Sequence, residues 1–143
     1  MDHVVYVDSK AGELGKILSG KKTMIIRGAA GRKLPYGRVN HEDMLYLIEN
    51  DGSGLIQARA KVKSVINSEK MTTEESVSLV EKNQGQLELT SKQFKRWAGK
   101  RYLVLIKITD AKAIEPFLID KSDYGNMDDW LPVGEIENVK IKG

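Results

Sequence analysis

The sequence predicts a domain of the α+β class that is mainly β, a small mixed barrel with short flanking helices. Its 143 residues are about the size of one domain, so a single domain over residues 1–143 is expected. The strand-type runs are short, and two of them are joined by a hairpin signal. Short helix-type segments stand between these runs, which favours a mixed barrel over a doubly wound parallel sheet.

The first elements follow in close succession. The apolar run at residues 4–7 predicts a strand. A short helix is expected over residues 11–18, with Ser9 as its N-cap and Gly20 as the glycine that ends it. Residues 23–27 are β-branched and apolar, so they predict a second strand.

A loop is expected at residues 28–37, which contain three glycines and Pro35. Loops of this composition lie on the surface, so we expect this one to carry Arg32, Lys33 and Tyr36 outward. Tyr36 directly follows Pro35 and is expected to be the most exposed aromatic side chain.

An Asp-Gly pair within residues 50–53 separates two apolar runs, residues 44–49 and 54–65. This pattern predicts a β-hairpin. In the second run apolar and polar residues alternate, which predicts one buried face and one basic, solvated face. The expected buried residues are Ile56, Ala58, Ala60 and Val62, with Ser64 as a further candidate.

Two helices are expected next. Residues 73–82 are amphipathic and begin after a cap at Thr72 or Thr73. A second helix is expected to begin at a capping box formed by Thr90 and Gln93 and to end before Gly99.

The remaining strands are expected after these helices. Residues 101–109 form the most apolar run, so they predict a central strand buried on both faces. Residues 114–119 and 135–141 are expected to be edge strands, separated by an acidic loop.

Composition excludes several classes of protein and site. The chain is 41% hydrophobic and 30% charged, which excludes a disordered or low-complexity chain. It has no cysteine and only His3 and His41 as soft ligands, so no disulfide, metal or other cofactor is expected. Without a run of roughly 18 apolar residues, we expect no membrane contact and a cytoplasmic location.

Charge is distributed unevenly along the chain. Residues 20–39 and residues 89–109 each carry six Lys or Arg residues and no acid, whereas residues 110–137 are mainly acidic. Such basic segments either keep a protein soluble or bind an anionic partner such as nucleic acid. With two acid-free segments in one small domain, an anionic partner and a merely solvated surface are about equally favoured.

A short motif at residues 20–27, GKKTMIIR, narrows the choice. The expected elements around it come in this order: a helix, the Gly-x-Lys turn, a strand ending in arginine, a basic loop and a further strand. This order resembles the ASCH family, small β-barrels of the PUA-like superfamily, whose pattern is approximately G-x-K-x-x-E-x-R. Gly20, Lys22 and Arg27 match that pattern, whereas Ile25 replaces its glutamate.

The resemblance extends over about residues 14–65. A Gly-Asp pair usual before the next strand of the family is replaced by Glu42 and Asp43, so only the aspartate matches. The strong strand at residues 102–108 fits the same barrel.

The resemblance implies a cleft near the Gly-x-Lys turn that holds RNA or a modified nucleoside. A row of cations beside such a cleft can contact successive phosphates, which gives affinity without sequence selectivity. The residues expected to bind nucleic acid are Lys21, Lys22, Arg27, Arg32, Lys33, Tyr36 and Arg38.

Aromatic side chains on which an unstacked base can lie are the second requirement of many RNA readers. The candidates are Tyr36 in the loop, Trp97, Tyr124 and Trp130. Trp97 lies in an amphipathic helix beside Phe94, which favours core packing over base stacking. For Trp130, base stacking and packing at one end of the barrel are equally favoured.

A hydrolase is the alternative function. Some ASCH relatives are amidohydrolases of acylated cytidines with a lysine, a threonine and a glutamate as the catalytic set. Lys22 matches the lysine, but Ile25 occupies the threonine position and cannot act as a nucleophile. The glutamate would have to come from the helix that carries Glu74, Glu75 and Glu81. We therefore assign no catalytic residue, and Lys22 would be one only in this alternative.

A protein interaction module is the third alternative. The acidic residues 120–137 would then contact a basic protein partner.

Overall fold

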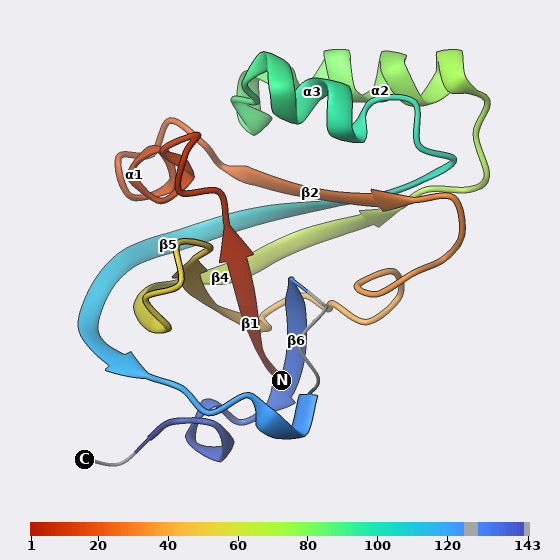
Figure 1. Ribbon diagram of the computed structural model, residues 1–143. Helices are drawn as coiled ribbons and strands as arrows, with labels where there is room; N and C mark the ends of the chain where they lie inside the picture. The colour runs from red at the N-terminus through yellow and green to blue at the C-terminus, as the bar shows by residue number, and fades with distance from the viewer. Residues whose placement is uncertain (125–128, 142–143) are drawn as a thin grey trace.

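The computed structural model describes residues 1–124 and 129–141. Within these residues six strands form one curled mixed sheet in the order β2-β5-β4-β3-β1-β6 (Figure 1). This half-barrel with short helices confirms the predicted class, a small α+β domain that is mainly β. The strands are β1 (Asp2–Val7), β2 (Met24–Ala29), β3 (Met44–Glu49), β4 (Leu55–Asn67), β5 (Tyr102–Leu118) and β6 (Trp130–Gly134).

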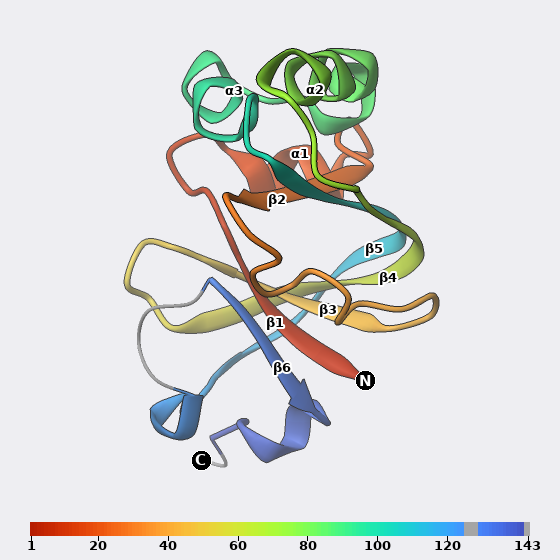
Figure 2. The same ribbon diagram turned by 90° about the vertical axis from the view of Figure 1, so that its right-hand side faces the viewer.

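Three α-helices accompany the sheet in the described part of the chain: α1 (Glu13–Leu18), α2 (Thr73–Leu87) and α3 (Ser91–Trp97). Helices α2 and α3 lie together over β2 and the first half of β5, as Figure 2 shows. Two short 3₁₀ turns, Ser122–Tyr124 and Ile136–Asn138, flank β6. None of these helices is long and apolar enough to span a membrane.

Strand β2 and the first half of β5 are buried on both faces. On β2, Ile25 packs into the core inside the curled sheet, whereas Met24 and Ile26 pack against α2 and α3. On β5, Val104 and Ile106 face the inside of the sheet, and Leu103 and Leu105 face the helices. A strand covered on both faces needs apolar residues at every position, which is why these runs do not alternate.

The β3–β4 hairpin is confirmed, with Leu45 opposite Ala60 and Leu47 opposite Ala58. The four apolar residues predicted to face inward on β4 are fully buried, whereas the further candidate Ser64 is exposed. On the opposite face Arg59 and Lys61 are half-buried, and Lys63 is exposed.

The helix caps are confirmed except for the first. Helix α2 begins at a capping box of Thr72 and Glu75, and α3 begins at one of Thr90 and Gln93. Helix α1 begins after Gly12, not after Ser9; Gly12 adopts the left-handed conformation that glycine favours.

Two predicted edge strands are wrong. Residues 114–119 do not form a separate strand, because β5 continues to Leu118 and bends sharply along β4 instead of ending (Figure 1). Asp110 adopts a left-handed conformation, and the pairing register shifts on either side of it, so bulges carry the bend. Residues 135–141 are also not a strand: β6 precedes them and ends at Gly134.

Gly28 on β2 provides a test of how tightly this sheet is packed. A Cβ atom at Gly28 would lie 2.7 Å from Leu103 Cδ2 and 3.2 Å from Lys100 Cβ. Leu103 is fully buried and cannot move aside freely. We expect Gly28→Ala to lower the free energy of unfolding by about 1–3 kcal/mol, measured by urea denaturation. Gly31→Ala is the matched control, because nothing lies within 4 Å of its Cβ position. Equal stabilities of the two variants would contradict this packing.

Candidate functional site

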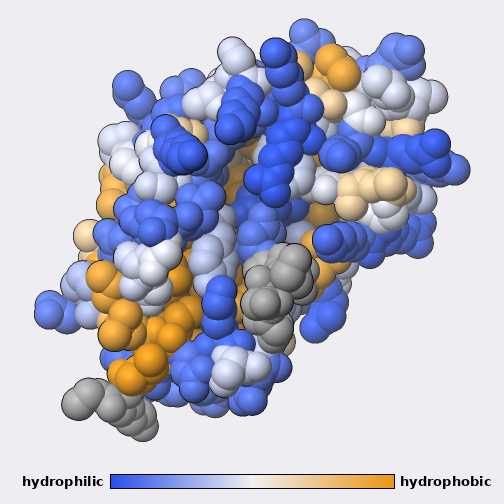
Figure 3. Space-filling view, in the orientation of Figure 1, coloured by the Kyte–Doolittle hydropathy of each residue, from blue (hydrophilic) through white to orange (hydrophobic). Residues whose placement is uncertain are grey.

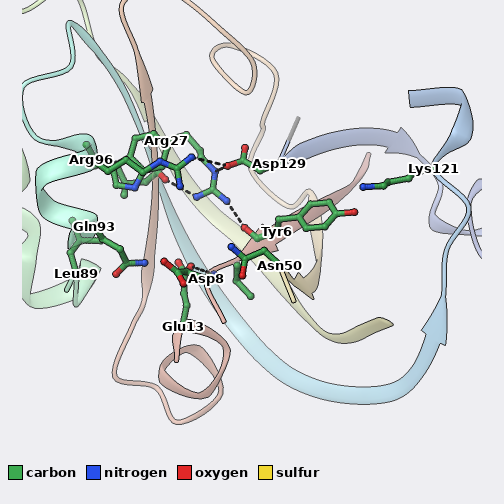
Figure 4. A pocket seen from close by; sticks show the side chains of 13 residues that line it. Tyr6, Asp8, Glu13, Arg27, Asn50, Leu89, Gln93, Arg96, Lys121 and Asp129 are labelled. Atoms are coloured by element: carbon green, nitrogen blue, oxygen red, sulfur yellow. Dashed lines mark hydrogen bonds and ion pairs between the residues drawn. The ribbon is translucent and has the colours of Figure 1, made fainter. Parts of the chain in front are cut away.

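A pocket of about 250 Å³ opens where the ends of β1 and β2 meet α1 and α3 (Figure 4). Its walls are mainly polar, with an apolar part formed by Val7, Ile26, Leu89 and Trp97. The polar lining residues are Tyr6, Asp8, Glu13, Arg27, Asn50, Gln93, Arg96, Lys121 and Asp129.

Arg27 is the central cation of this pocket. Its Nη1 donates a hydrogen bond to the carbonyl of Ile26 at 2.8 Å, and its Nη2 donates one to the carbonyl of Tyr6 at 2.6 Å. The guanidinium lies over the rings of Trp97 and Trp130, at 5.8 and 5.6 Å from their centroids. These contacts fix a charged group that is only 7% exposed.

One donor of Arg27 has no hydrogen-bond partner among the described residues. Its Nε is buried, and Asp129 Oδ2 lies 3.4 Å away, close enough for an ion pair but outside hydrogen-bond geometry. Buried donors are nearly always satisfied, so this atom is an unusual feature of the residue at the centre of the pocket.

Lys22 lies beneath the pocket and does not line it. It is 1% exposed, its Nζ donates a hydrogen bond to the carbonyl of Leu87, and Glu13 Oε2 lies 3.5 Å from that nitrogen. Burial lowers the pKa of Lys22, while Glu13 opposes this shift and Arg27 adds to it. The carboxylate beside Lys22 therefore comes from α1, and not from α2 as the hydrolase alternative required.

A second, adjoining pocket of about 320 Å³ shares four residues with the first: Arg27, Arg96, Trp97 and Asp129. We call it the groove. Lys33 enters it from the loop after β2, and Lys100 enters it from the segment between α3 and β5. The two acid-free segments of the sequence therefore meet at one place.

The other predicted residues lie outside this junction or are buried. Lys21 and Arg38 are exposed and line neither the pocket nor the groove. Tyr36 is half-buried, contrary to the prediction: its hydroxyl donates a hydrogen bond to the carbonyl of Ser68 at 2.6 Å, and its ring contacts Tyr102 edge-on. Arg32 is exposed and lies over these two rings.

The two tryptophans contribute to the core and to the site. Trp97 is 7% exposed, packs with the apolar residues under α2 and α3, and lines both the pocket and the groove. Trp130 is 1% exposed and lines only the groove. Both tryptophans therefore pack in the core. For Trp97 the sequence favoured this interpretation, and for Trp130 it favoured core packing and base stacking equally.

The acidic segment 120–137 contributes Asp129 to the site. Asp129 lies 3.4 Å from Arg27 and 3.7 Å from Arg96, so it pairs within the molecule. Residues 125–128 of the segment lie outside the described residues.

No family model and no curated protein matches the sequence. Among solved structures, ASCH from Zymomonas mobilis is similar with a TM-score of 0.63 and 16% identity, over 90% of this chain and 82% of that chain. A point mutant of that protein gives a TM-score of 0.62 and 17% identity, over 90% and 84% of the two chains. The chain has the ASCH fold. At this level of identity the likeness establishes the fold alone.

The ASCH-like motif has a structural explanation in this chain. Gly20 has a φ of 82° and ends α1, which lets the chain turn back toward β2. Lys22 faces Glu13, and Arg27 faces the pocket. Ile25 is fully buried, so the hydrophobic core occupies the position of the family's glutamate or threonine.

Asp43, the matching aspartate of the ASCH pattern, belongs to a buried network that the sequence did not predict. Trp130 Nε1 donates a hydrogen bond to His3 Nδ1 at 3.0 Å, which assigns the proton of the ring to Nε2. Nε2 then donates a hydrogen bond to Asp43 Oδ2 at 2.8 Å. His3 was considered only as a metal ligand, and its partners are too distant in sequence to form a local pattern. The described residues contain no group of three or more His, Cys, Asp or Glu side chains that could hold a metal ion.

The His3 network makes stability depend on pH. Burial lowers the pKa of His3 below its usual 6.5, although Asp43 and Asp2 oppose this shift; the Met1 amino group adds to it. As the pH falls through about 6.5, the unfolded chain binds a proton that the folded chain does not. We therefore expect the free energy of unfolding to decrease from about pH 7.5 to 5.5, measured by urea denaturation.

His3→Gln should lose this part of the pH dependence and should cost about 1–3 kcal/mol near neutral pH, because Trp130 or Asp43 loses its partner. His41→Gln, at an exposed site, is the control and should keep the dependence of the unchanged protein. Identical pH profiles for all three proteins would exclude this role of His3.

Proposed function

We propose that the protein binds single-stranded RNA, with one nucleoside in the pocket and the adjoining phosphates along the groove. The observation that carries the proposal is the meeting of the two acid-free segments at one groove that is continuous with a polar pocket. Folding alone does not require cations from segments far apart in the sequence to lie side by side, because like charges repel each other.

Charge separates the two compartments. The pocket is lined by three cations and three acids, namely Arg27, Arg96, Lys121, Asp8, Glu13 and Asp129. The groove contains Arg27, Lys33, Arg96 and Lys100 with Asp129 as its one acid. The groove is therefore the more favourable place for phosphates, and the nearly neutral pocket suits an uncharged nucleoside.

Burial supports the same arrangement. Lys33 and Lys100 are exposed, and the side chain of Arg96 is 62% exposed, so all three are accessible to a polymer. Arg27 is fixed at the junction and can orient the ligand without the entropy cost of ordering a long side chain. Trp97 adds an apolar surface between the two compartments.

Hydrolysis of an acylated nucleoside has less support. Lys22 Nζ is held by the Leu87 carbonyl and Glu13, and Ile25 offers no hydroxyl group. The Lys22→Ala exchange would leave a buried carboxylate without its partner, so loss of binding in that variant would report on folding as well as on the site.

The groove can be tested by the salt dependence of RNA binding. We expect Lys33→Ala, Lys100→Ala and Arg96→Ala each to weaken binding of a mixed-sequence single-stranded RNA. Each variant should also reduce the slope of log K against log salt by about 0.7 per lost phosphate contact. Fluorescence anisotropy of a labelled RNA over a salt series measures both quantities.

Lys112→Ala is the matched control, because Lys112 is exposed and lines a different pocket with Arg59 and Lys61. Its slope should equal that of the unchanged protein. Equal slopes in all four variants would show that the groove does not hold the phosphates, and no binding at low salt would refute the RNA proposal itself.

A further inference from the structure

The pocket contains acceptors and donors of hydrogen bonds whose positions are fixed by the backbone. On the acceptor side, Asp8 Oδ1 accepts a hydrogen bond from the Ala11 amide at 3.1 Å, and Oδ2 has no hydrogen-bond partner among the described residues. Beside it, Glu13 Oε1 accepts one from the Asp8 amide at 2.7 Å, and Glu13 Oε2 lies 3.5 Å from Lys22 Nζ. Figure 4 shows both carboxylates directed into the pocket.

The donor side is formed by two amides. Gln93 Oε1 accepts the hydrogen bond of the α3 capping box from the Thr90 amide at 3.0 Å, so its Nε2 is the atom left for a ligand. Asn50 Oδ1 accepts a hydrogen bond from the Ser9 amide at 2.9 Å, which leaves Nδ2 as a donor. Each amide orientation is therefore determined by a backbone contact.

Arg27 provides independent support for a ligand here. Its side chain is 9% exposed, it lines the pocket, and its buried Nε has no hydrogen-bond partner in the described part of the chain. Buried donors without a partner are rare in folded proteins, and this one belongs to a residue that lines the pocket. A ligand in the pocket would meet donors from the two amides and an acceptor from Asp8.

We infer that the pocket selects a nucleobase that carries an exocyclic amino group and discriminates against uracil. An amino group donates to a carboxylate, whereas the O4 carbonyl of uracil would face Asp8 as a second acceptor. The O2 carbonyl of the base, present in both pyrimidines, is an acceptor for Gln93 or Asn50. This inference rests on the proposed binding of RNA.

Oligocytidylate and oligouridylate are the matched probes, because their backbones are the same and their bases differ on this edge. We expect the protein to bind oligocytidylate at least about tenfold more tightly than oligouridylate near neutral pH, since a good base contact discriminates by about that factor or more. Anisotropy titrations at one salt concentration measure the ratio.

Asp8→Asn tests the assignment of the acceptor. Asparagine keeps an oxygen for the Ala11 amide and replaces the free carboxylate oxygen by an amide donor. The preference should shift toward oligouridylate. Asp110→Asn is the control, because Asp110 is exposed, lines another pocket and has a left-handed conformation that asparagine tolerates. It should keep the preference.

Gln93→Glu tests the donor side without disturbing the helix. Glutamate at this position of a capping box is as suitable as glutamine, so α3 should keep its stability in thermal unfolding. The amide donor is lost and a further acid enters the pocket, so binding of oligocytidylate should weaken by about tenfold or more.

The outcomes separate the two proposals. Equal binding of both oligonucleotides, with the salt slope still dependent on Lys100 and Arg96, would overturn the base selectivity and retain RNA binding. An unchanged preference in Asp8→Asn would also overturn it. Binding of neither oligonucleotide would refute the proposed function, and the inference with it.

Discussion

The burial of β2 on both faces is the constraint on which the site depends. A strand with the core on one face and two helices on the other has no solvated position for a charged side chain. The two cations of the motif, Lys22 and Arg27, therefore lie just before the strand and near its end. Each is buried, so each must be compensated by carbonyl oxygens or carboxylates.

The compensation of these cations brings together elements that do not pair in the sheet. Lys22 connects the end of α2, through the Leu87 carbonyl, with Glu13 of α1. Arg27 connects β2 with β1 through the Tyr6 carbonyl, and with Asp129 at the start of β6. In sheet order β2 and β6 are at opposite edges, so these polar contacts join the two edges of the curled sheet where the pocket opens.

Much of the fold is encoded by local patterns. The Asp-Gly hairpin, the alternation on β4 and the Thr90–Gln93 capping box each involve residues close in sequence, and each is confirmed. The predicted end of β5 was wrong because the apolar run stops at residue 109, whereas the strand continues through a bend at Asp110. The end of an apolar run does not distinguish a bulge within a strand from a loop between strands.

The site is less predictable for a related reason. Arg27, Lys33 and Trp97, which line the pocket or the groove, could be named as candidates because charge and aromatic character are visible residue by residue. Glu13 was missed because an acid in the first turn of a helix has an ordinary explanation in the helix dipole. The His3, Asp43 and Trp130 network was missed because its members come from three separate parts of the chain. The exposure of Tyr36 was wrong because its proline and glycine neighbours determine the loop but not the contact with Ser68.

Gln93 shows how a local rule can determine a functional geometry. The capping box requires the Gln93 side-chain oxygen to accept from the Thr90 backbone amide, which stabilises the start of α3. The same hydrogen bond directs the remaining amide hydrogens toward the pocket (Figure 4). Asn50 is oriented in the same way by the Ser9 amide. The donors of the pocket are thus preorganised by backbone contacts that the fold needs in any case, and a ligand gains their hydrogen bonds without ordering them.

Hydrophilic and hydrophobic residues occupy different parts of the face shown in Figure 3. Hydrophilic residues dominate the α2 and α3 end of the face shown in Figure 3, where exposed Lys92, Lys95 and Arg96 belong to α3. Hydrophobic residues gather on the same face near the end of β5, where Leu118 and Ile141 are 48% and 46% exposed. On this face the basic and apolar surfaces thus lie at opposite ends. A polyanion bound along the groove as proposed would therefore be attracted from the end that carries the cations and would not cross the apolar patch on this face.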